Sequence, residues 1–256
     1  SLFSQKNPLR DLNHELTASL IRALYDYQPS MSDSESLSLW ITVIQQAHLA
    51  LYSMKKELCL KMISDLVISF TACFQSESII VYNSASQSLK RIIEDIIADS
   101  LDDTPPEIMM NIIETFENCL SFKYQNARSS ICSVISTIFQ TIGAKKPHLV
   151  KNLIKLLANL REGYNSQFFV DIDQALASAV KFVGPQHIIE AIPLEINLVQ
   201  NDFGFSWLIP IFRANIAKTQ LSFFVDYFIP LSDKVEKIIK ELEEQDSQVE
   251  VKLYQV

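Results

Sequence analysis

The sequence predicts an all-α protein in which antiparallel helix pairs stack into an α-solenoid. Apolar residues recur with a period near 3.6 along most of the chain, and turn-forming residues fall between these periodic segments. Runs that alternate apolar and polar residues, as a strand does, are nearly absent. Of the 256 residues, 48% are hydrophobic and 20% are charged, so we expect the chain to bury a sizeable core.

The periodic segments predict a series of helices, the first of which covers Leu12 to Tyr27. The apolar stripes of the next helices run through Leu37–Leu51, Leu58–Cys73, Val81–Ile96, Ile108–Leu120, Ile131–Ile142, Leu149–Leu160 and Ile172–Val183. Some of these helices carry a second apolar face, as Cys59, Ile63 and Val67 do beside the stripe that starts at Leu58. A helix that lies between two neighbouring repeats requires two such faces.

Capping residues and turn residues mark the helix ends. Ser32-Asp33-Ser34-Glu35 and Thr104-Pro105-Pro106-Glu107 both have the pattern of a capping box, and the second places proline at the first helical position. We expect Pro147 and Pro185 to open helices. We expect the glycines to lie at helix ends or in loops that favour a positive φ, namely Gly143, Gly163, Gly184 and Gly204.

The spacing of the helix pairs predicts the type of repeat. Hairpins are expected to start near Lys55, Pro105 and Pro147, which are 50 and 42 residues apart. This spacing fits the roughly 40–47 residues of HEAT and armadillo repeats better than the roughly 34 of tetratricopeptide repeats. We expect residues 1–184 to form the array and residues 185–256 to form shorter helices that continue or cap it. The chain lacks an initial Met and ends in apolar sequence, so we expect it to be a segment of a longer protein.

Residue patterns for catalysis or ligand binding are missing from the sequence. The glycines lie too far apart for a phosphate-binding loop, and His14 is not part of an H-E-x-x-H motif. The cysteines are too widely spaced for a zinc knuckle, and we expect Cys59, Cys73, Cys119 and Cys132 to be buried thiols. The longest charge-free run has about 16 residues, whereas a membrane span needs roughly 20. We therefore predict a non-enzymatic interaction scaffold with no catalytic residue, cofactor, metal, small-molecule substrate or membrane contact.

One window has a charge opposite to that of the whole chain, whose net charge is −8. Between Lys145 and Arg161 every charged residue is basic, and a protein that contacts RNA through phosphates needs such a patch. The alternative is a solvated helix face, because Lys151 and Lys155 lie one turn apart and away from the leucine stripe. The candidate RNA or partner contacts are Lys145, Lys146, Lys151, Lys155 and Arg161.

An acidic cluster precedes this window, at the predicted C-terminal end of the Val81–Ile96 helix. It consists of Glu94, Asp95, Asp99, Asp102 and Asp103. Negative charge is unfavourable near the C-terminus of a helix dipole, so a solvated helix end is one interpretation. Electrostatic contact with a basic partner is the other.

Three stretches of the chain resemble a known family. They are Asn7-Pro8-Leu9 with Ala23–Pro29; Gly184-Pro185 with Ala191–Leu194; and Ser206–Arg213 with Tyr227–Leu231. In this order and at these separations they resemble the central region of the ribosomal-RNA-processing protein twelve family. The members of this family are large eukaryotic HEAT-repeat factors. The residues that carry the resemblance are Tyr25, Asp26, Tyr27, Pro29, Trp207, Pro210, Arg213 and Pro230.

The resemblance implies a non-enzymatic factor in ribosome biogenesis, acting in small-subunit pre-rRNA processing, pre-ribosome assembly and nuclear export. It implies pre-ribosomal proteins as partners, with pre-rRNA and nuclear transport factors as further candidates, and a location in the nucleolus and nucleus with shuttling to the cytoplasm. An importin- or exportin-like transport receptor that binds Ran or cargo is the alternative. We expect Trp207 to dock the helices after Gly204 onto the array.

Overall fold

The computed structural model describes residues 8–163, 168–194, 205–217 and 219–244. Every regular element in these ranges is helical, which confirms the predicted all-α class. The chain forms two compact units, Ser1–Asn215 and Ile216–Val256. None of the described helices combines the length and the apolar character that a membrane span requires.

The first unit contains the long helices and several short 3-10 and π-helical turns that extend them. Its helices are α1 (Pro8–Asp26), α2 (Ser34–Met54), α3 (Lys56–Ala72), α4 (Ile79–Ile92), α5 (Pro106–Asn118), α6 (Arg128–Ile138), α7 (Lys151–Glu162), α8 (Phe169–Phe182), α9 (Pro185–Ala191) and α10 (Leu208–Asn215). The short turns are η1 (Cys73–Gln75), η2 (Ile93–Ile97), η3 (Phe122–Ala127), η4 (Phe139–Gly143) and η5 (Pro147–Val150).

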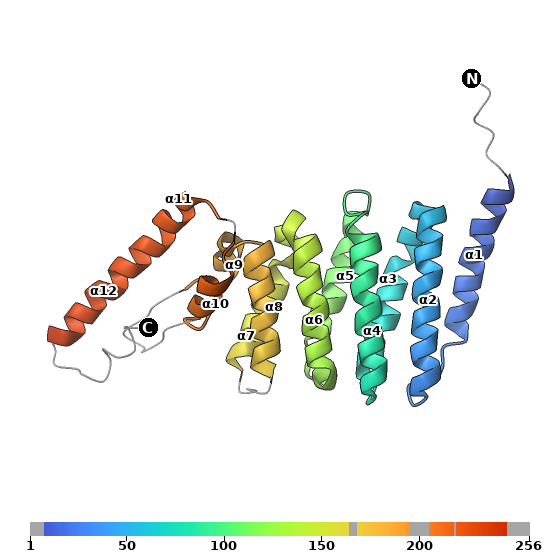
Figure 1. Cartoon of the computed structure of the whole chain (residues 1–256), viewed down its shortest axis with the longest axis horizontal. Helices are drawn as coiled ribbons and strands as arrows, with labels where there is room; N and C mark the ends of the chain where they lie inside the picture. Colours follow the sequence, from blue (N-terminus) through green and yellow to red (C-terminus); the bar gives the residue numbers. More distant parts are fainter. Residues whose placement is uncertain (1–7, 164–167, 195–204, 218, 245–256) are drawn as a thin grey trace, which may run out of the picture. The chain divides into compact units, whose positions relative to one another are not determined.

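These helices form two layers (Figure 1). In one layer α1, α2, α4, α6, α8 and α10 each pack against the next, and in the other α3, α5, α7 and α9 do so. From α2 to α9 successive helices alternate between the layers, and the shortest link is Lys55 alone between α2 and α3. The first unit is therefore a stack of helix pairs, as an α-solenoid requires.

Hydrogen bonds between side chains connect equivalent positions of neighbouring repeats. Ser38 pairs with Ser84, 46 residues later, at 2.8 Å, and Ser88 donates to Gln45, 43 residues earlier, at 2.7 Å. Ser129 continues the series by donating to Asp171, 42 residues later. These separations match the repeat length that the sequence predicts.

The buried face of α7 differs from the predicted stripe. Val150, Leu153, Ile154, Leu157 and Ala158 are buried. Of the predicted stripe only Leu153 is fully buried, and the other members, Leu149, Leu156 and Leu160, are half-exposed. Two leucine-rich stripes with helical spacing overlap in this segment, and the helices packed around α7 determine which one is buried.

Both predicted capping boxes are wrong in detail. Asp33, rather than Ser32, caps α2, because its Oδ1 accepts a hydrogen bond from the backbone N–H of Ser36 at 3.1 Å. The hydroxyl of Thr104 donates to the carbonyl of Ser100 at 2.8 Å and does not cap α5. The prolines behave as predicted: Pro106 begins α5, Pro147 begins η5 and Pro185 begins α9.

The described glycines have different structural roles. Gly184, with φ of 101°, is the glycine among them that has a positive φ. Gly143 lies inside η4, where a Cβ atom would come within 2.7 Å of the Val183 Cγ2. Gly163 is extended, with φ of −64°. The expectation of positive φ was therefore wrong for Gly143 and Gly163, and Gly204 lies outside the described residues.

The predicted division at residue 184 falls inside the first unit. The helix α9 packs on α7 and α8, and α10 packs on α8. The second unit contains α11 (Leu221–Phe223), the π-helical turn η7 (Phe224–Phe228) and α12 (Ile229–Glu244). Aromatic rings gather within it, where Phe224 stacks on Phe228 at 5.7 Å. Whether these last helices continue or cap the array stays a prediction.

The structure places the cysteine thiols as expected, and it also buries a histidine. All four cysteines are free and buried, and burial raises the pKa of the Cys59 thiol to about 12. His48 is fully buried, and its ring Nδ1 lies 2.9 Å from the carbonyl oxygen of Ile44.

Candidate interaction surface

The first two residues of the predicted basic window bind the preceding repeat. The Lys145 ammonium donates to the carbonyl oxygen of Ala98 at 3.1 Å. The Lys146 ammonium donates to the carbonyl of Leu101 at 2.7 Å and lies 3.3 Å from a carboxylate oxygen of Asp102. The carbonyls that follow α4 and η2 lack partners within the helix, and a cation is favourable at this end of the helix dipole.

The acidic cluster that precedes the window is matched by cations within the protein. Asp99 accepts hydrogen bonds from Lys56 at 2.8 Å and from the Tyr52 hydroxyl at 2.7 Å. These two donors, Lys56 first, hold the pKa of the Asp99 carboxyl below its usual range. Asp95 pairs with Arg91 at 3.2 Å. Most of the cluster thus has intramolecular partners.

Arg161, at the other end of the basic window, connects α7 to α8 and to the residue that precedes α10. Its Nε donates to Asp173 of α8 at 2.9 Å. Its guanidinium also lies 4.0 Å from the ring centroid of Phe169 and 5.0 Å from that of Trp207, which precedes α10. An arginine held by a carboxylate and two aromatic rings is positioned for packing.

Two basic residues of the window, Lys151 and Lys155, have no partner in the described part of the chain. Both side chains are exposed on α7, and neither has a hydrogen bond or an ion pair to any part of the chain that the structure describes. Lys145, Lys146 and Arg161 have partners inside the chain, whereas Lys151 and Lys155 have none among the described residues. An RNA or partner contact of the five residues stays a prediction.

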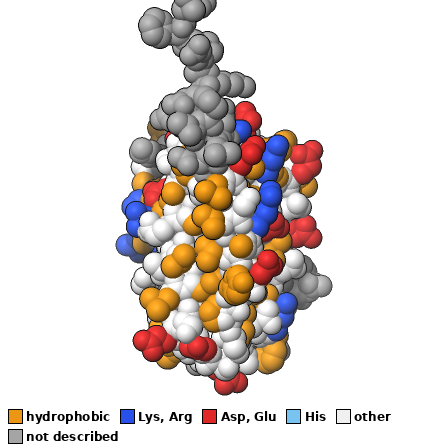
Figure 2. Space-filling view, turned by 90° about the vertical axis from the view of Figure 1, so that its right-hand side faces the viewer, with side chains coloured by type: hydrophobic (Ala, Val, Ile, Leu, Met, Phe, Trp, Pro, Cys, Tyr) orange, Lys and Arg blue, Asp and Glu red, His pale blue; other side chains and the backbone are white. Residues whose placement is uncertain are grey.

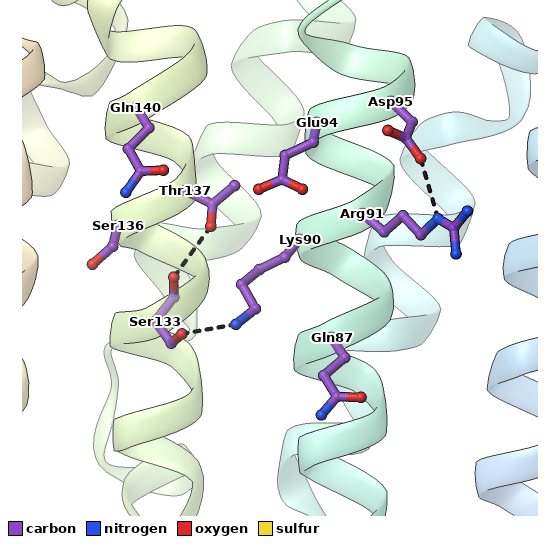
Figure 3. Close-up of a pocket in the computed structure, with 9 residues that line it drawn as sticks. All are labelled: Gln87, Lys90, Arg91, Glu94, Asp95, Ser133, Ser136, Thr137 and Gln140. Atoms are coloured by element: carbon purple, nitrogen blue, oxygen red, sulfur yellow. Dashed lines mark hydrogen bonds and ion pairs between the residues drawn. The ribbon is translucent and has the colours of Figure 1, made fainter.

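A polar groove of 640 Å³ lies between α4 and α6 (Figure 3). Across it the Lys90 ammonium donates to the Ser133 hydroxyl at 3.1 Å. The carboxylate of Glu94 points into the groove, and the Arg91–Asp95 pair lies at its far side. The lining side chains are charged or carry amides or hydroxyls: Gln87, Lys90, Arg91, Glu94, Asp95, Ser133, Ser136, Thr137 and Gln140.

This groove offers hydrogen-bond donors and acceptors together with charges of both signs. It suits contact with a polar partner surface. The sequence did not predict the groove because its two walls are 46 residues apart in the chain, as Gln87 and Ser133 are. The only sequence signal is the run of Ser, Thr and Gln on the exposed sides of both helices.

Comparison with known proteins identifies the family to which the chain belongs. The model of the family described as "Ribosomal RNA-processing protein 12, HEAT repeats" matches residues 75–256. The chain belongs to this family. It is 31% identical to the human RRP12-like protein over 265 aligned residues, which cover 99% of the chain and 20% of the human protein.

Other relatives in the ribosomal RNA-processing protein 12 family cover the chain to a similar extent. The RRP12-like protein of Gallus gallus is 29% identical over 99% of the chain. Ribosomal RNA-processing protein 12 of Saccharomyces cerevisiae is 23% identical over 91% of the chain. The chain spans about a fifth of the length of the curated relatives it matches.

Within the first unit, the residues that carried the family resemblance lie at two separate places. Tyr25 packs edge-on against Trp40, with ring centroids 5.9 Å apart, so the first motif attaches α1 to α2. Trp207 is half-exposed and lies against Arg161 of α7. The other motif residues are exposed or half-exposed: Asp26, Tyr27, Pro29, Pro210, Arg213 and Pro230.

The end of the first unit at α1 is apolar. Figure 2 shows hydrophobic side chains in a band across this face. On α1, Leu16 is 58% exposed, Leu20 is 56% exposed and Tyr27, just beyond the helix, is 79% exposed. Leu16 and Leu20 lie one helical turn apart, on the side of α1 that does not pack against α2.

Proposed function

We propose that this chain is a non-enzymatic HEAT-repeat scaffold that works in ribosome biogenesis. The match to a ribosomal RNA-processing HEAT family over residues 75–256 carries this proposal. The relatives that span the chain bear names of ribosomal RNA-processing proteins. The finer role is in small-subunit pre-rRNA processing, pre-ribosome assembly and nuclear export, in the nucleolus and nucleus with shuttling to the cytoplasm.

The architecture supports a scaffolding role. Hydrogen bonds such as Ser38–Ser84 and Lys90–Ser133 tie each repeat to the next, so the helices keep their relative positions. Between the repeats lie grooves such as the one between α4 and α6. A stack of similar grooves can contact a large particle at several points, and several weak contacts on one rigid body together give strong binding. The partners are proteins of the pre-ribosomal particle, with pre-rRNA and nuclear transport factors as further candidates.

Purification of the tagged full-length protein that contains this chain tests the proposal. We expect small-subunit pre-rRNA, measured by hybridisation, together with pre-ribosomal assembly proteins, identified by mass spectrometry. Recovery of Ran and diverse cargo without pre-rRNA would instead support a nuclear transport receptor. A tagged unrelated HEAT-repeat protein of similar charge provides the control for non-specific RNA recovery.

A further inference from the structure

The helices α2, α4, α6 and α8 all begin at one edge of the first unit, which is the lower edge in Figure 1. The described segments that lead into these helices are residues 27–33, 73–78, 119–127 and 168. We call these segments, together with the first turn of each of the four helices, the N-terminal edge.

Hydrogen bonds join the segments of the N-terminal edge to one another. The Ser76 hydroxyl donates to the carbonyl of Met31 at 3.5 Å, and the Gln75 amide donates to the Tyr124 hydroxyl at 3.5 Å. The hydrogen bond that Ser129 donates to α8 connects the starts of α6 and α8. Each segment therefore touches the next, and the N-terminal edge is one continuous surface.

Large apolar side chains are exposed in every segment of this surface. Ile79 and Ile80 in the first turn of α4, Phe122 of η3 and Val170 in the first turn of α8 are each at least 62% exposed. Met31, before α2, is 38% exposed. A row of exposed apolar side chains along a continuous surface favours contact with a partner protein.

The opposite edge, where the same four helices end, has a different composition. Its exposed large apolar side chains in the described residues are Met54 and Phe182, and both are less than half exposed. Charged side chains dominate it, and Lys56 and Asp99 pair there at 2.8 Å. Exposed apolar side chains are thus a property of the N-terminal edge and not of helix links in general.

The exposed charges of the N-terminal edge are mainly acidic. Asp33, Glu35 and Glu77 are exposed, and Lys123 is the exposed cation among these residues. The carboxylate of Asp33 caps α2, whereas those of Glu35 and Glu77 have no partner in the described part of the chain. The three carboxylates outweigh the charge of roughly +0.5 that each of the N-termini of α2 and α4 contributes.

A pocket of 490 Å³ lies where the segment before α2 meets the segment before α4. Its lining contains the side chain of Met31, the carboxylate of Glu77 and several hydroxyls, and no cation. Lysine and arginine combine an aliphatic stem with a cationic head. Such a side chain fits this lining, because its stem can lie on Met31 while its head pairs with Glu77.

The spacing of the row suits an amphipathic helix. Packed helices lie roughly 8–10 Å apart, so the apolar side chains of successive segments have about this separation. Two turns of an α-helix advance about 11 Å. A helix with a large apolar residue at every seventh position would therefore place one such residue on each segment.

We propose that the N-terminal edge binds a basic amphipathic helix of a partner protein. The apolar residues of that helix pack on the row from Met31 to Val170, and its lysines or arginines face Glu35 and Glu77. RNA is disfavoured, because its phosphates would face these carboxylates. The inference rests on the proposed role as a scaffold for protein partners and specifies the chemistry of one of them.

Peptide binding to the 256-residue chain tests this inference. The probe is a fluorescein-labelled helical peptide of about 21 residues, long enough to cross three segments, with leucine at every seventh position and lysines beside it. Its companion is a scrambled peptide of the same composition. We expect the patterned peptide to bind about tenfold more tightly, because the scrambled peptide has the same charge but buries fewer leucines.

Matched variants locate the apolar contact. Ile80→Ser/Phe122→Ser should weaken binding of the patterned peptide about tenfold, because two apolar contacts are lost. The control is Ile68→Ser/Met110→Ser, which changes two exposed apolar residues on α3 and α5 and should leave the affinity unchanged. Far-UV circular dichroism and thermal melts verify that both variants fold.

A second pair of variants tests the sign of the charge. Glu35→Gln/Glu77→Gln should weaken binding about threefold at low ionic strength and less in high salt, because exposed ion pairs are weak and screened. The matched control Glu107→Gln/Glu114→Gln removes two exposed carboxylates from α5 and should leave the affinity unchanged.

Several outcomes would overturn the inference. These are the absence of peptide binding, equal affinity for the patterned and scrambled peptides, and wild-type affinity in either N-terminal edge variant. An oligouridine of about 20 nucleotides is the competitor. If it displaces the peptide, the edge accepts phosphates and the inference fails.

The two proposals fail separately. Loss of peptide binding while the full-length protein still co-purifies with pre-rRNA rejects the docking edge only. Peptide binding without pre-rRNA recovery rejects the role in ribosome biogenesis and leaves the docking edge intact.

Discussion

At the scale of single residues, His48 is a buried group that can titrate near neutral pH. Its Nδ1 donates to the carbonyl of Ile44, and its Nε2 lies 3.5 Å from the Tyr25 hydroxyl. Both nitrogens of the neutral ring therefore have hydrogen-bond partners. Burial lowers the pKa of His48, and this effect outweighs the opposing influence of the Ile44 hydrogen bond and of the Asp65 charge.

The lowered pKa of His48 predicts a loss of stability below pH 6.5, the ordinary value of histidine. In the window between the folded and unfolded pKa values the unfolded chain binds a proton that the folded chain excludes. Stability is therefore fully present above 6.5 and falls as the pH decreases, by about 1.4 kcal/mol per pH unit. Urea unfolding on both sides of pH 6.5 measures this slope. A His48→Asn variant, though less stable overall, should lose the slope, and an unchanged slope would assign it to another group.

Substitution of Gly184 is expected to strain the backbone without causing a steric clash. Its φ of 101° and ψ of 147° belong to a region that only glycine adopts readily, although no atom lies within 4 Å of the position that a Cβ would take. Gly184→Ala should therefore lower the free energy of unfolding by about 1–3 kcal/mol. Gly163→Ala is the matched control, because φ of −64° suits alanine and the nearest atom lies 3.4 Å away. It should be neutral or stabilising by up to about 1 kcal/mol. Equal effects in guanidinium denaturation would contradict the backbone explanation.

At the scale of elements, lysines that the sequence predicts to form a charged surface instead connect one repeat to the next by hydrogen bonds. Lys146 is 45 residues from the Leu101 carbonyl to which it donates. Its ion pair with Asp102 is largely exposed on the aspartate side, so most of the stabilisation comes from the carbonyl hydrogen bond.

Replacement of Lys146 by alanine should therefore lower the free energy of unfolding by about 1 kcal/mol, the cost of one such hydrogen bond. Lys151→Ala, a change of the same residue type in the same window, should change it by less than about 0.5 kcal/mol. Thermal and urea unfolding of the two variants measure the difference. If both variants were as stable as the wild type, the contact of Lys146 with the preceding repeat would not contribute to folding.

At the scale of the first unit, the apolar end at α1 predicts association. Leu16 and Leu20 are each more than half exposed, and such a face favours contact with another apolar surface. The 256-residue chain should therefore self-associate as its concentration rises.

Charge on this face should abolish the association. Leu16→Glu/Leu20→Glu is expected to give a monomer in sedimentation equilibrium with an unchanged melting temperature. The control is Ile79→Glu/Ile80→Glu, which changes two isoleucines of similar exposure (62% and 63%) at the start of α4. If both variants reduced self-association equally, association would depend on the total apolar surface and not on the α1 face.

Much of the fold could be predicted from the sequence, because helix formation depends on residues within about one turn of each other. The period of 3.6 identified the helices, Pro106, Pro147 and Pro185 marked where three elements begin, and the spacing of the hairpins indicated the repeat length. The cysteines lie within the same apolar periodic segments, and they are buried as predicted.

The candidate surfaces could be predicted only in part, because they depend on residues about 41 to 47 positions away in the chain. No local pattern shows that Lys145 reaches Ala98, or that Arg161 packs against Trp207. The window from Lys145 to Arg161 was therefore predicted as one charged face, whereas three of its five basic residues have partners inside the protein.

The sequence by itself determined that this chain folds into helical repeats of a particular length and that it resembles a ribosomal RNA-processing family. Only the tertiary structure decided which leucines of α7 belong to the core and which line a groove, and which charged residues face solvent. The physical reason is that a helix presents every side of its surface to some neighbour or to water. The stacking of repeats, which no single segment encodes, assigns each side to one or the other.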